Sequence, residues 1–443
     1  MTGGDRGAPV LQITPPARAG FTAPANLKQN LASEAVRQVH KRIIICADGT
    51  WNSTKATATV GSDAATNVWL TYQLVKPYAN DKTPQLAYYH PGVGTGGFID
   101  RIVGGATGYG LNRNIQECYR FLIDHYHPGD YVYLFGFSRG AYTIRSLAGL
   151  VRNCGIINPE KLPLGKSLDE TVREAFKLYR KRGDATAPSA QRSVDFRMQH
   201  SHPDFRITCI GVWDTVGSLG IPVGLIGRLT SHLVGFHDVT LSSWVDCAFH
   251  AVAVDERRRP FVPTLWLQQP DAREHGQRIE QRWFTGVHSD VGGGYSWAER
   301  GLATTTLDWM VESVTSACKL ELDASAMNGA PPSASALHDS LTLWYRAWKP
   351  ANRTIDGGLG HHGARDDARI TGECIDESIG QWRAKYATVP MPVVNKPYTP
   401  DNVLEYEERI SEQANTPPVQ PPDYPSDLRE TGMPHLRDAD RGE

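Results

Sequence analysis

Short apolar runs alternate with longer amphipathic stretches along most of this chain. Runs of strand length, rich in β-branched and aromatic residues, occupy Lys41–Cys46, Gln85–His90, Tyr131–Phe135, Phe205–Trp213 and Arg282–Val287. Stretches that favour helices occupy Asn67–Leu74, Leu111–Tyr126, Ala141–Val151, residues 168–182, Leu241–Val254 and Leu302–Cys318. Strands that alternate with helices predict an α/β fold with a mostly parallel central sheet flanked by helices.

The chain divides into three predicted regions. Residues 1–38 lack sustained periodicity and predict a flexible N-terminal arm, residues 39–410 predict one domain, and residues 411–443 predict a disordered C-terminal tail. Within the domain, the predicted parts are a core over about 40–318 and a helical insertion, cap or edge elements over about 152–204 and 320–410.

Two connections are unusually rich in glycine. Residues 91–110 lack the Lys-Ser/Thr ending of a phosphate-binding loop, so they are predicted to pass near an active site rather than to bind a nucleotide. Residues 215–241 are apolar and glycine-rich, but too short and interrupted to span a bilayer. This second connection could be a mobile lid, the wall of an acyl pocket or a loop in the core.

Two polar clusters have mainly structural interpretations. Ser167 and Glu170 predict a capping box at the start of the helix over residues 168–182. The charged segment Asp255–Pro260 is expected to pair internally on a surface, with contact to a lipid head group as the alternative.

Composition narrows the class of protein. The net charge of −2 does not favour nucleic acid or an anionic membrane as a partner over the whole chain. No apolar run is long enough for a transmembrane helix, and the N-terminus lacks the apolar core of a signal peptide. Seven cysteines without a CxxC motif indicate neither a disulfide framework nor a zinc site. We therefore expect a protein that is cytoplasmic as synthesised, without cofactor or metal.

Residues 136–140 read GFSRG and lie between a predicted strand and a predicted helix. In that context the G-x-S-x-G pattern predicts a nucleophile elbow, which exposes the hydroxyl of Ser138 above the sheet. The alternative is that Ser138 only caps the helix. Donors for an oxyanion are expected from the N–H of Arg139 and from that of Gly49 or Thr50.

Asp214 and His288 also follow apolar strand-like runs. With Ser138 they give the chain order Ser, Asp, His of a hydrolase triad, in which the imidazole is the base and the carboxylate orients it. The alternatives are a helix-capping role for Asp214 and a structural role for His288. Competing side chains are Asp255, Asp290, His250 and the pair His361-His362.

Asp48 requires a separate interpretation, because a carboxylate beside an oxyanion site would oppose the developing charge. We expect it to turn away and to fix its loop by accepting N–H bonds. A cation site that includes Asp48 and Asp290 is the alternative, although the spacing typical of hard-cation ligands is not evident.

Several longer segments carry a family resemblance. They read IIICADGTWN, GATGYGLNRNIQECYRFLIDHYHPGDYVYLFGFSRGAYTIRSLAGLVRNCGI, GVWDTVGSLGIP, HAVAVDERRRPF and WFTGVHSDVGGGY. Together they resemble the α/β-hydrolase domain of the first type VI secretion lipase effector family and of related uncharacterised hydrolases. The resemblance implies an α/β-hydrolase fold and a triad of Ser138, Asp214 and His288. The best-known members look like phospholipases that cleave acyl esters of bacterial membrane phospholipids.

These features predict a serine hydrolase that cleaves carboxylic esters of lipids through an acyl-enzyme, with phospholipids as the first expectation. A soluble carboxylesterase of non-lipid substrates and a non-catalytic binding module on the same fold remain open as alternatives. The expected partners are a lipid or other ester substrate and a membrane surface contacted peripherally. A delivered toxin would be exported by a type VI secretion system, with an immunity protein or a secretion-machine component as a further partner.

Overall fold

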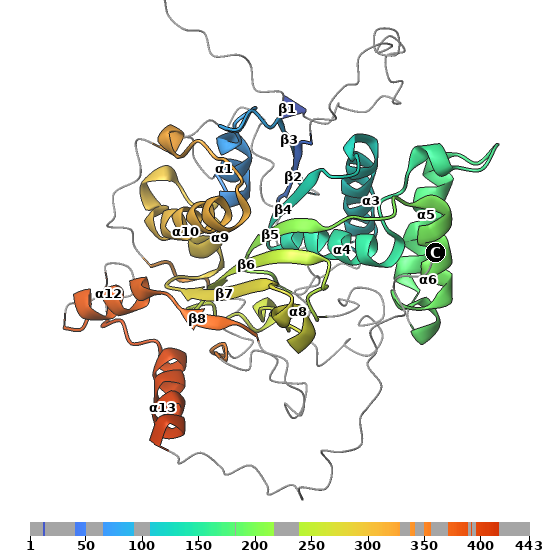
Figure 1. The fold of residues 1–443 in the computed structure, drawn as a ribbon. Helices are drawn as coiled ribbons and strands as arrows, with labels where there is room; N and C mark the ends of the chain where they lie inside the picture. Colours follow the sequence, from blue (N-terminus) through green and yellow to red (C-terminus); the bar gives the residue numbers. More distant parts are fainter. Residues whose placement is uncertain are drawn as a thin grey trace, which may run out of the picture. The chain divides into compact units, whose positions relative to one another are not determined.

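One parallel sheet organises the part of the chain that the structure describes. The computed structural model describes residues 12–13, 40–49, 65–92, 107–181, 183–216, 239–327, 337–341, 350–355, 371–388, 391 and 396–415. Eight strands in these ranges form a sheet in the order β1-β3-β2-β4-β5-β6-β7-β8, and every neighbouring pair is parallel (Figure 1). The strands are β1 (Gln12–Ile13), β2 (Arg42–Ala47), β3 (Gln85–His90), β4 (Tyr131–Phe137), β5 (Ile207–Trp213), β6 (Val245–Ala253), β7 (Arg278–Phe284) and β8 (Glu373–Ile375).

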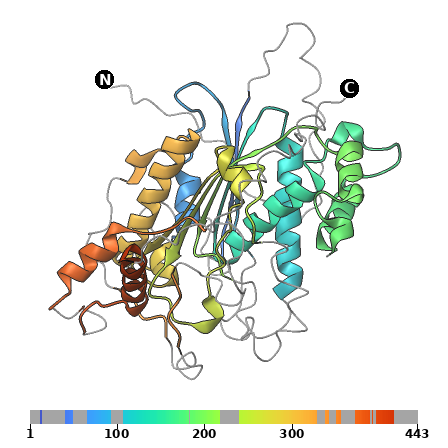
Figure 2. The ribbon, with the colours of Figure 1, turned by 60° about the horizontal axis from the view of Figure 1, so that its bottom comes forward.

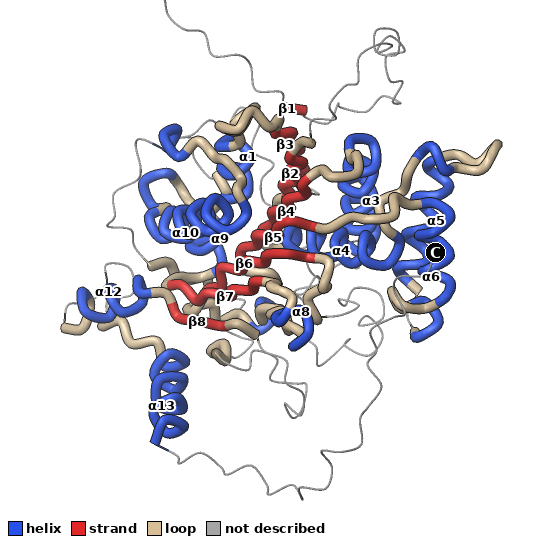
Figure 3. The backbone as a smooth tube through the Cα atoms, viewed as in Figure 1, coloured by secondary structure: helices blue, strands red, loops and turns tan. Residues whose placement is uncertain are grey.

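Helices lie between most of the successive strands along the described chain (Figure 3). They are α1 (Asn67–Leu74), α3 (Thr107–His125), α4 (Arg139–Cys154), α5 (Leu168–Arg180), α6 (Gln191–His200), α8 (Pro270–Glu274), α9 (His288–Gly292), α10 (Gly301–Cys318), α12 (Glu377–Lys385) and α13 (Asp401–Asn415). Contacts divide the chain into two compact units, Met1–Val403 and Leu404–Glu443, and the sheet lies in the first. None of the described helices is both long and apolar enough to cross a bilayer.

Helices cover both faces of the sheet. Helices α3 and α4 pack on one face, and α1 and α10 pack on the other (Figure 2). In β2, Ile43 and Ile45 belong to the core under α3 and α4, whereas Ile44 and Cys46 belong to the core under α1 and α10. Successive strand side chains point to opposite faces, so a strand covered on both sides is apolar at every position. This burial explains why the central strands are continuous apolar runs in the sequence.

Most of the predicted elements are confirmed, with boundaries that differ by a few residues. The predicted helices at Leu111–Tyr126 and Ala141–Val151 are α3 and α4, and the predicted strand at Gln85–His90 is β3. The capping box of Ser167 and Glu170 is present at the start of α5. Helices α5 and α6, which form the predicted insertion, pack against α4 on the outside of the sheet.

The helix predicted over Leu241–Val254 is wrong, because this segment contains strand β6. Alanine and aspartate, which this segment contains, have low strand propensity. However, β6 lies between β5 and β7, where Ala248 is buried on one face of the sheet and Phe249 on the other. Burial on both faces therefore outweighs the local propensity, and His250 lies on a strand rather than on a helix.

The chain ends show smaller differences from the prediction. Within the predicted N-terminal arm, Gln12 and Ile13 pair with β3 as strand β1. Within the predicted tail, helix α13 continues to Asn415. Residues 1–11, 14–38 and 416–443 lie outside the described residues. Strand β8, from the later part of the chain, extends the sheet beyond β7.

Candidate active site

A strained turn joins β4 to α4 at Ser138. The backbone of Ser138 has φ 55° and ψ −118°, which is rare for a residue with a side chain. The turn also brings α4 very close to β2, because a Cβ atom on Gly140 would lie 2.0 Å from the carbonyl oxygen of Ala47. Glycine is required at this position, and the geometry corresponds to the predicted strand, sharp turn and helix.

Three polar side chains meet above the carboxyl ends of the strands. The Nε2 atom of His288 lies 2.9 Å from Ser138 Oγ, and its Nδ1 atom lies 2.5 Å from Asp214 Oδ2. Ser138 follows β4 directly, Asp214 follows β5, and His288 is the first residue of α9 after β7. The structure thus brings together the three residues that the sequence singled out, with the imidazole between the hydroxyl and the carboxylate.

Aromatic side chains enclose the imidazole of His288. The rings of Phe137 and Phe261 lie 4.6 Å and 5.1 Å from it, measured between centroids. His288 is 5% exposed and Ser138 is 6% exposed, so only a small part of each side chain reaches solvent. Burial lowers the pKa of His288 below its usual 6.5, although the neighbouring Asp214 acts to raise it. The lowered pKa favours the neutral form of the imidazole at pH 7.

Asp214 is completely buried and fully hydrogen-bonded. Besides His288, it receives the N–H of Ala253 at 3.0 Å on Oδ1. The guanidinium of Arg353 donates to both of its carboxylate oxygens, at 2.6 Å from Nη1 and 3.0 Å from Nη2. Although burial acts to raise it, the charge of Arg353 and the bond from His288 hold the pKa of Asp214 well below its usual range. Asp214 therefore stays ionised over the whole range in which His288 titrates.

Arg353 is a site residue that the sequence did not indicate. Its side chain is buried, and Nη1 also donates to the carbonyl oxygen of Ala253 at 2.7 Å. It lies in a stretch without strand or helix periodicity and without a motif, so no local pattern marks it. A buried carboxylate at the end of β5 requires a positive partner, but the sequence does not reveal which arginine supplies it.

Glu256 is a second buried carboxylate beside the imidazole. Its Oε2 atom accepts the backbone N–H of His288 at 3.3 Å, and Arg258 binds it through Nε at 2.9 Å and Nη2 at 2.7 Å. Although burial acts to raise it, Arg258 holds the pKa of Glu256 below its usual range. The expected internal pairing of this charged segment is therefore confirmed. Its expected place on the surface holds for Arg259, which is exposed, but not for Glu256, which is 1% exposed.

The predicted oxyanion donors have different surroundings. Arg139 begins α4, where the first N–H groups have no acceptor within the helix. Gly49 lies beside the serine, since a Cβ atom on it would be 3.4 Å from Ser138 Cβ, but its N–H donates to Asp48 Oδ1 at 2.7 Å. Thr50 lies outside the described residues. Of the three predicted residues, Arg139 and Gly49 thus flank Ser138, and the Gly49 N–H is directed to a carboxylate.

Asp48 fixes its loop, as expected. Besides the N–H of Gly49, its carboxylate accepts the hydroxyl of Thr66 at 2.5 Å and that of Tyr89 at 2.8 Å. Among the described residues, no cluster of three or more His, Cys, Asp or Glu side chains has the arrangement of a metal site. The carboxylate of Asp48 is instead directed into the protein and holds the end of β2 in place.

The competing residues have other partners. Asp255 accepts the N–H of Gly286 at 2.7 Å, and Asp290 lies 2.6 Å from the Nδ1 atom of His338. The Nε2 atom of His250 accepts the N–H of Thr215 at 3.0 Å. His361, His362 and most of the apolar connection 215–241 lie outside the described residues. The described competitors are therefore held in separate hydrogen bonds, away from the Ser138 hydroxyl.

Comparison with known proteins identifies the family. Residues 41–313, more than half of the chain, match the profile of the family described as T6SS, phospholipase effector Tle1-like, catalytic domain. The uncharacterized protein YEL023C of Saccharomyces cerevisiae is 30% identical over 250 residues, which are 52% of this chain and 33% of the yeast protein. The chain thus spans about a third of the length of this curated relative.

Solved structures with some likeness to this chain include two proteins at 17% identity. One is an uncharacterized protein from Pseudomonas aeruginosa (70% of this chain, 49% of that chain, TM-score 0.35). The other is the Tle1 effector bound to the VgrG spike from the type VI secretion system (64% of this chain, 57% of that chain, TM-score 0.32). Esterase 2 of Thermogutta terrifontis is 12% identical (62% of this chain, 81% of that chain, TM-score 0.30). On the strength of the profile match, this chain belongs to the family of Tle1-like phospholipase effectors of the type VI secretion system, which it matches over their catalytic domain.

Proposed function

We propose that this protein is a serine hydrolase that cleaves carboxylic esters of lipids, with phospholipids as its substrates. The observation that carries the proposal is the position of the His288 imidazole, 2.9 Å from Ser138 Oγ and 2.5 Å from Asp214 Oδ2. A neutral imidazole at this distance can accept the serine proton, and an ionised carboxylate on its other nitrogen stabilises the cation that forms.

In the first half of the proposed reaction, Ser138 Oγ attacks the acyl carbonyl carbon while its proton moves to His288 Nε2. The carbonyl oxygen gains the negative charge, and the N–H of Arg139 at the start of α4 is the proposed donor to it. When the tetrahedral intermediate collapses, the ester C–O bond breaks and the imidazolium returns its proton to the leaving alcohol. The acyl group then remains on Ser138 as an ester.

In the second half, water replaces the alcohol. His288 takes a proton from the water as the hydroxide attacks the acyl-enzyme, and then gives that proton back to Ser138 Oγ. The products are a free fatty acid and the regenerated enzyme. Asp214 remains ionised throughout, because Arg353 and the N–H of Ala253 hold its charge.

Hydrolysis assays test this function. We expect the wild type to cleave short p-nitrophenyl esters and the acyl esters of phospholipid vesicles, and Ser138→Ala to lose at least about 10³-fold in rate. Ser316→Ala, which removes an exposed hydroxyl on α10, serves as the control and should keep full activity. Equal activity of wild type and Ser138→Ala would overturn the proposal. Cleavage of the short esters without cleavage of the vesicles would favour a carboxylesterase of soluble substrates.

We further propose that the enzyme acts as a delivered effector. The support is its family, whose described members are phospholipase effectors, and a related Tle1 effector has been solved bound to the VgrG spike. Phospholipids are the expected target, and a secretion-machine component and an immunity protein are the expected partners. Expression in a bacterium with and without a fused signal peptide tests this proposal. Growth arrest only in the exported form, and only with Ser138 intact, would support it, whereas harmless export of the active enzyme would contradict it.

A further inference from the structure

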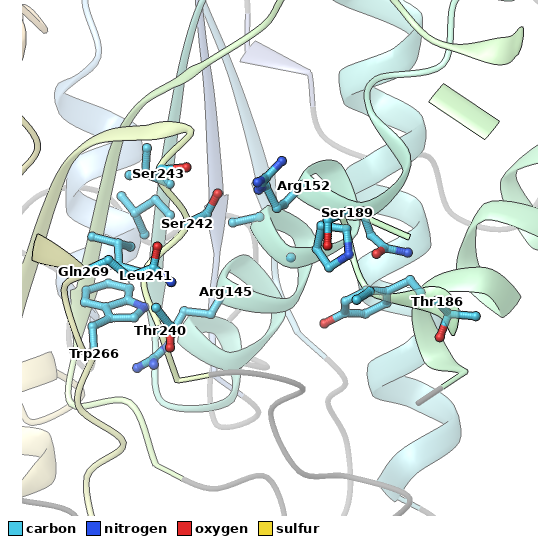
Figure 4. Close-up of a pocket in the computed structure, with 18 of the residues that line it drawn as sticks. Arg145, Arg152, Thr186, Ser189, Thr240, Leu241, Ser242, Ser243, Trp266 and Gln269 are labelled. Carbon is cyan, nitrogen blue, oxygen red and sulfur yellow. The ribbon is translucent and has the colours of Figure 1, made fainter. Parts of the chain in front are cut away.

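A cavity lies on the α4 side of the sheet. Its volume is about 500 Å³, and α4, the segment after α5 and the chain on either side of β6 line it (Figure 4). The α4 residues that face it include Arg145, Gly149 and Arg152, which share one face of the helix. Arg145 and Arg152 are 7 and 14 positions after Ser138, so they lie about 10 Å and 20 Å farther along α4 at 1.5 Å per residue. Ser138, Asp214 and His288 are not among its described lining residues, so the cavity is separate from the proposed catalytic site.

The described lining of this cavity is positively charged. It contains Arg145, Arg152 and Lys181, and none of its described residues is an aspartate or a glutamate. Arg197 lies close by, because its guanidinium and that of Arg152 both lie over the ring of Trp244, at 5.4 Å and 4.1 Å from the centroid. Like charges this close repel each other, and an anion between or beside them would relieve the repulsion.

Arg152 has little internal compensation for its charge. Its side chain is half-buried, and among the described residues it forms no salt bridge. Its contact with Trp244 is a cation–π interaction, which is weaker than a hydrogen-bonded ion pair. Burial and the charge of Arg197 both lower the pKa of Arg152. A guanidinium in these surroundings gains stability from a bound anion.

Hydroxyl groups complete the lining on both sides of Arg152. Ser242 and Ser243 belong to the turn before β6, and Ser189 belongs to the segment that precedes α6 (Figure 4). The hydroxyl oxygen of Ser242 accepts the N–H of Trp244 at 3.2 Å, which leaves its hydrogen available as a donor. Guanidinium groups together with serine hydroxyls form the donor set that suits the tetrahedral oxygens of a phosphate.

We propose that this cavity binds a small molecule through a phosphate mono- or diester group, with Arg152 as its main contact. The volume lies in the range of small-molecule pockets, about 300–1,000 Å³, so the ligand is larger than the phosphate alone. The phosphate group could belong to a soluble compound or to a lipid head group, and the two sources require different measurements. The inference concerns binding only and does not depend on the reactivity of Ser138.

Titration calorimetry with sn-glycerol 3-phosphate tests the soluble source, with glycerol as the neutral control. We expect saturable binding to the wild type, no binding of glycerol, and at least about 10-fold weaker binding to Arg152→Gln, in keeping with the loss of a hydrogen-bonded charge. Arg113→Gln, which removes an exposed arginine paired with Glu117 on α3, is the matched control and should bind as the wild type does. Ser138→Ala should also bind as the wild type does, whatever the outcome of the hydrolysis assays.

Co-sedimentation with vesicles tests the lipid source. Stronger binding of Ser138→Ala to phosphatidylglycerol vesicles than to vesicles of a neutral glycolipid, reduced by Arg152→Gln, would assign the cavity to a lipid head group. Lys181→Glu changes an exposed residue of the same lining and should weaken whichever binding is found, even if Arg152→Gln does not fold. The proposal is overturned if neither probe binds, or if both lining variants bind as tightly as Arg113→Gln.

Discussion

At the residue scale, two buried ion pairs lie beside one neutral imidazole. Asp214 is paired with Arg353 and Glu256 with Arg258, and both carboxylates contact His288. Each buried carboxylate is therefore neutralised by its own arginine. Neither of them requires a protonated histidine as its positive partner. This arrangement explains how a histidine beside two acids can remain neutral and basic at pH 7.

The pH dependence of the reaction follows from the pKa of His288. Burial lowers this pKa below its usual 6.5, and the base works only in its neutral form. As the pH rises through the pKa, the imidazolium loses its proton and the activity appears. We therefore expect kcat/KM for a soluble p-nitrophenyl ester to rise with an apparent pKa below about 6.5 and to stay level from pH 7 to 8. A rising limb centred above pH 7 would contradict the assignment of His288 as the base.

Arg353 should contribute strongly to stability. Replacing it with methionine would leave Asp214, which is completely buried, without its cationic partner. We expect a loss of about 3–5 kcal/mol in the free energy of unfolding, because an unpaired buried charge is costly. Arg206→Met breaks an exposed pair with Asp246 and should cost less than about 1 kcal/mol. Urea unfolding of the two variants measures the difference, and similar losses in both would show that Arg353 does not stabilise Asp214.

At the element scale, the approach of α4 to β2 depends on one glycine. A Cβ atom at Gly140 would overlap the carbonyl oxygen of Ala47, and neither backbone can move without disturbing the turn at Ser138. We expect Gly140→Ala to lower the free energy of unfolding by more than about 2 kcal/mol, as overpacking does. Gly380→Ala is the control, because Gly380 lies in α12 with open space around its Cα, and alanine there should stabilise by about 1 kcal/mol. An unchanged melting temperature of Gly140→Ala would contradict the close packing.

The strength of the hydrophobic pattern decided which elements could be predicted. Strands β2 and β4 are buried on both faces and stand out as apolar runs, and α3 repeats its apolar residues with the period of a helix. Strand β6 is also largely buried, but it contains three alanines and an aspartate, which have low strand propensity, so its position between β5 and β7 decides its structure. Tertiary burial of this kind cannot be read from a local window of sequence.

At the scale of the whole molecule, the parallel sheet gathers side chains that are far apart in the sequence. Ser138, Asp214 and His288 follow strands whose carboxyl ends share one edge, so their order and context were enough to predict that the three side chains lie close together. Arg353 comes from a segment with no regular pattern, and it contacts Asp214 across 139 positions of sequence. Long-range ion pairs of this type depend on how loops return to the sheet, which sequence periodicity does not encode.

The most direct test of the account is whether Ser138 is a reactive nucleophile. Intact-mass and peptide mass spectrometry after treatment with a fluorophosphonate would measure this, because such reagents phosphonylate an activated serine hydroxyl with loss of fluoride. We predict one adduct per chain on Ser138 in the wild type, and none in Ser138→Ala or in the wild type unfolded in urea. An unlabelled wild type, or equal labelling of the wild type and Ser138→Ala, would contradict the proposed serine hydrolase.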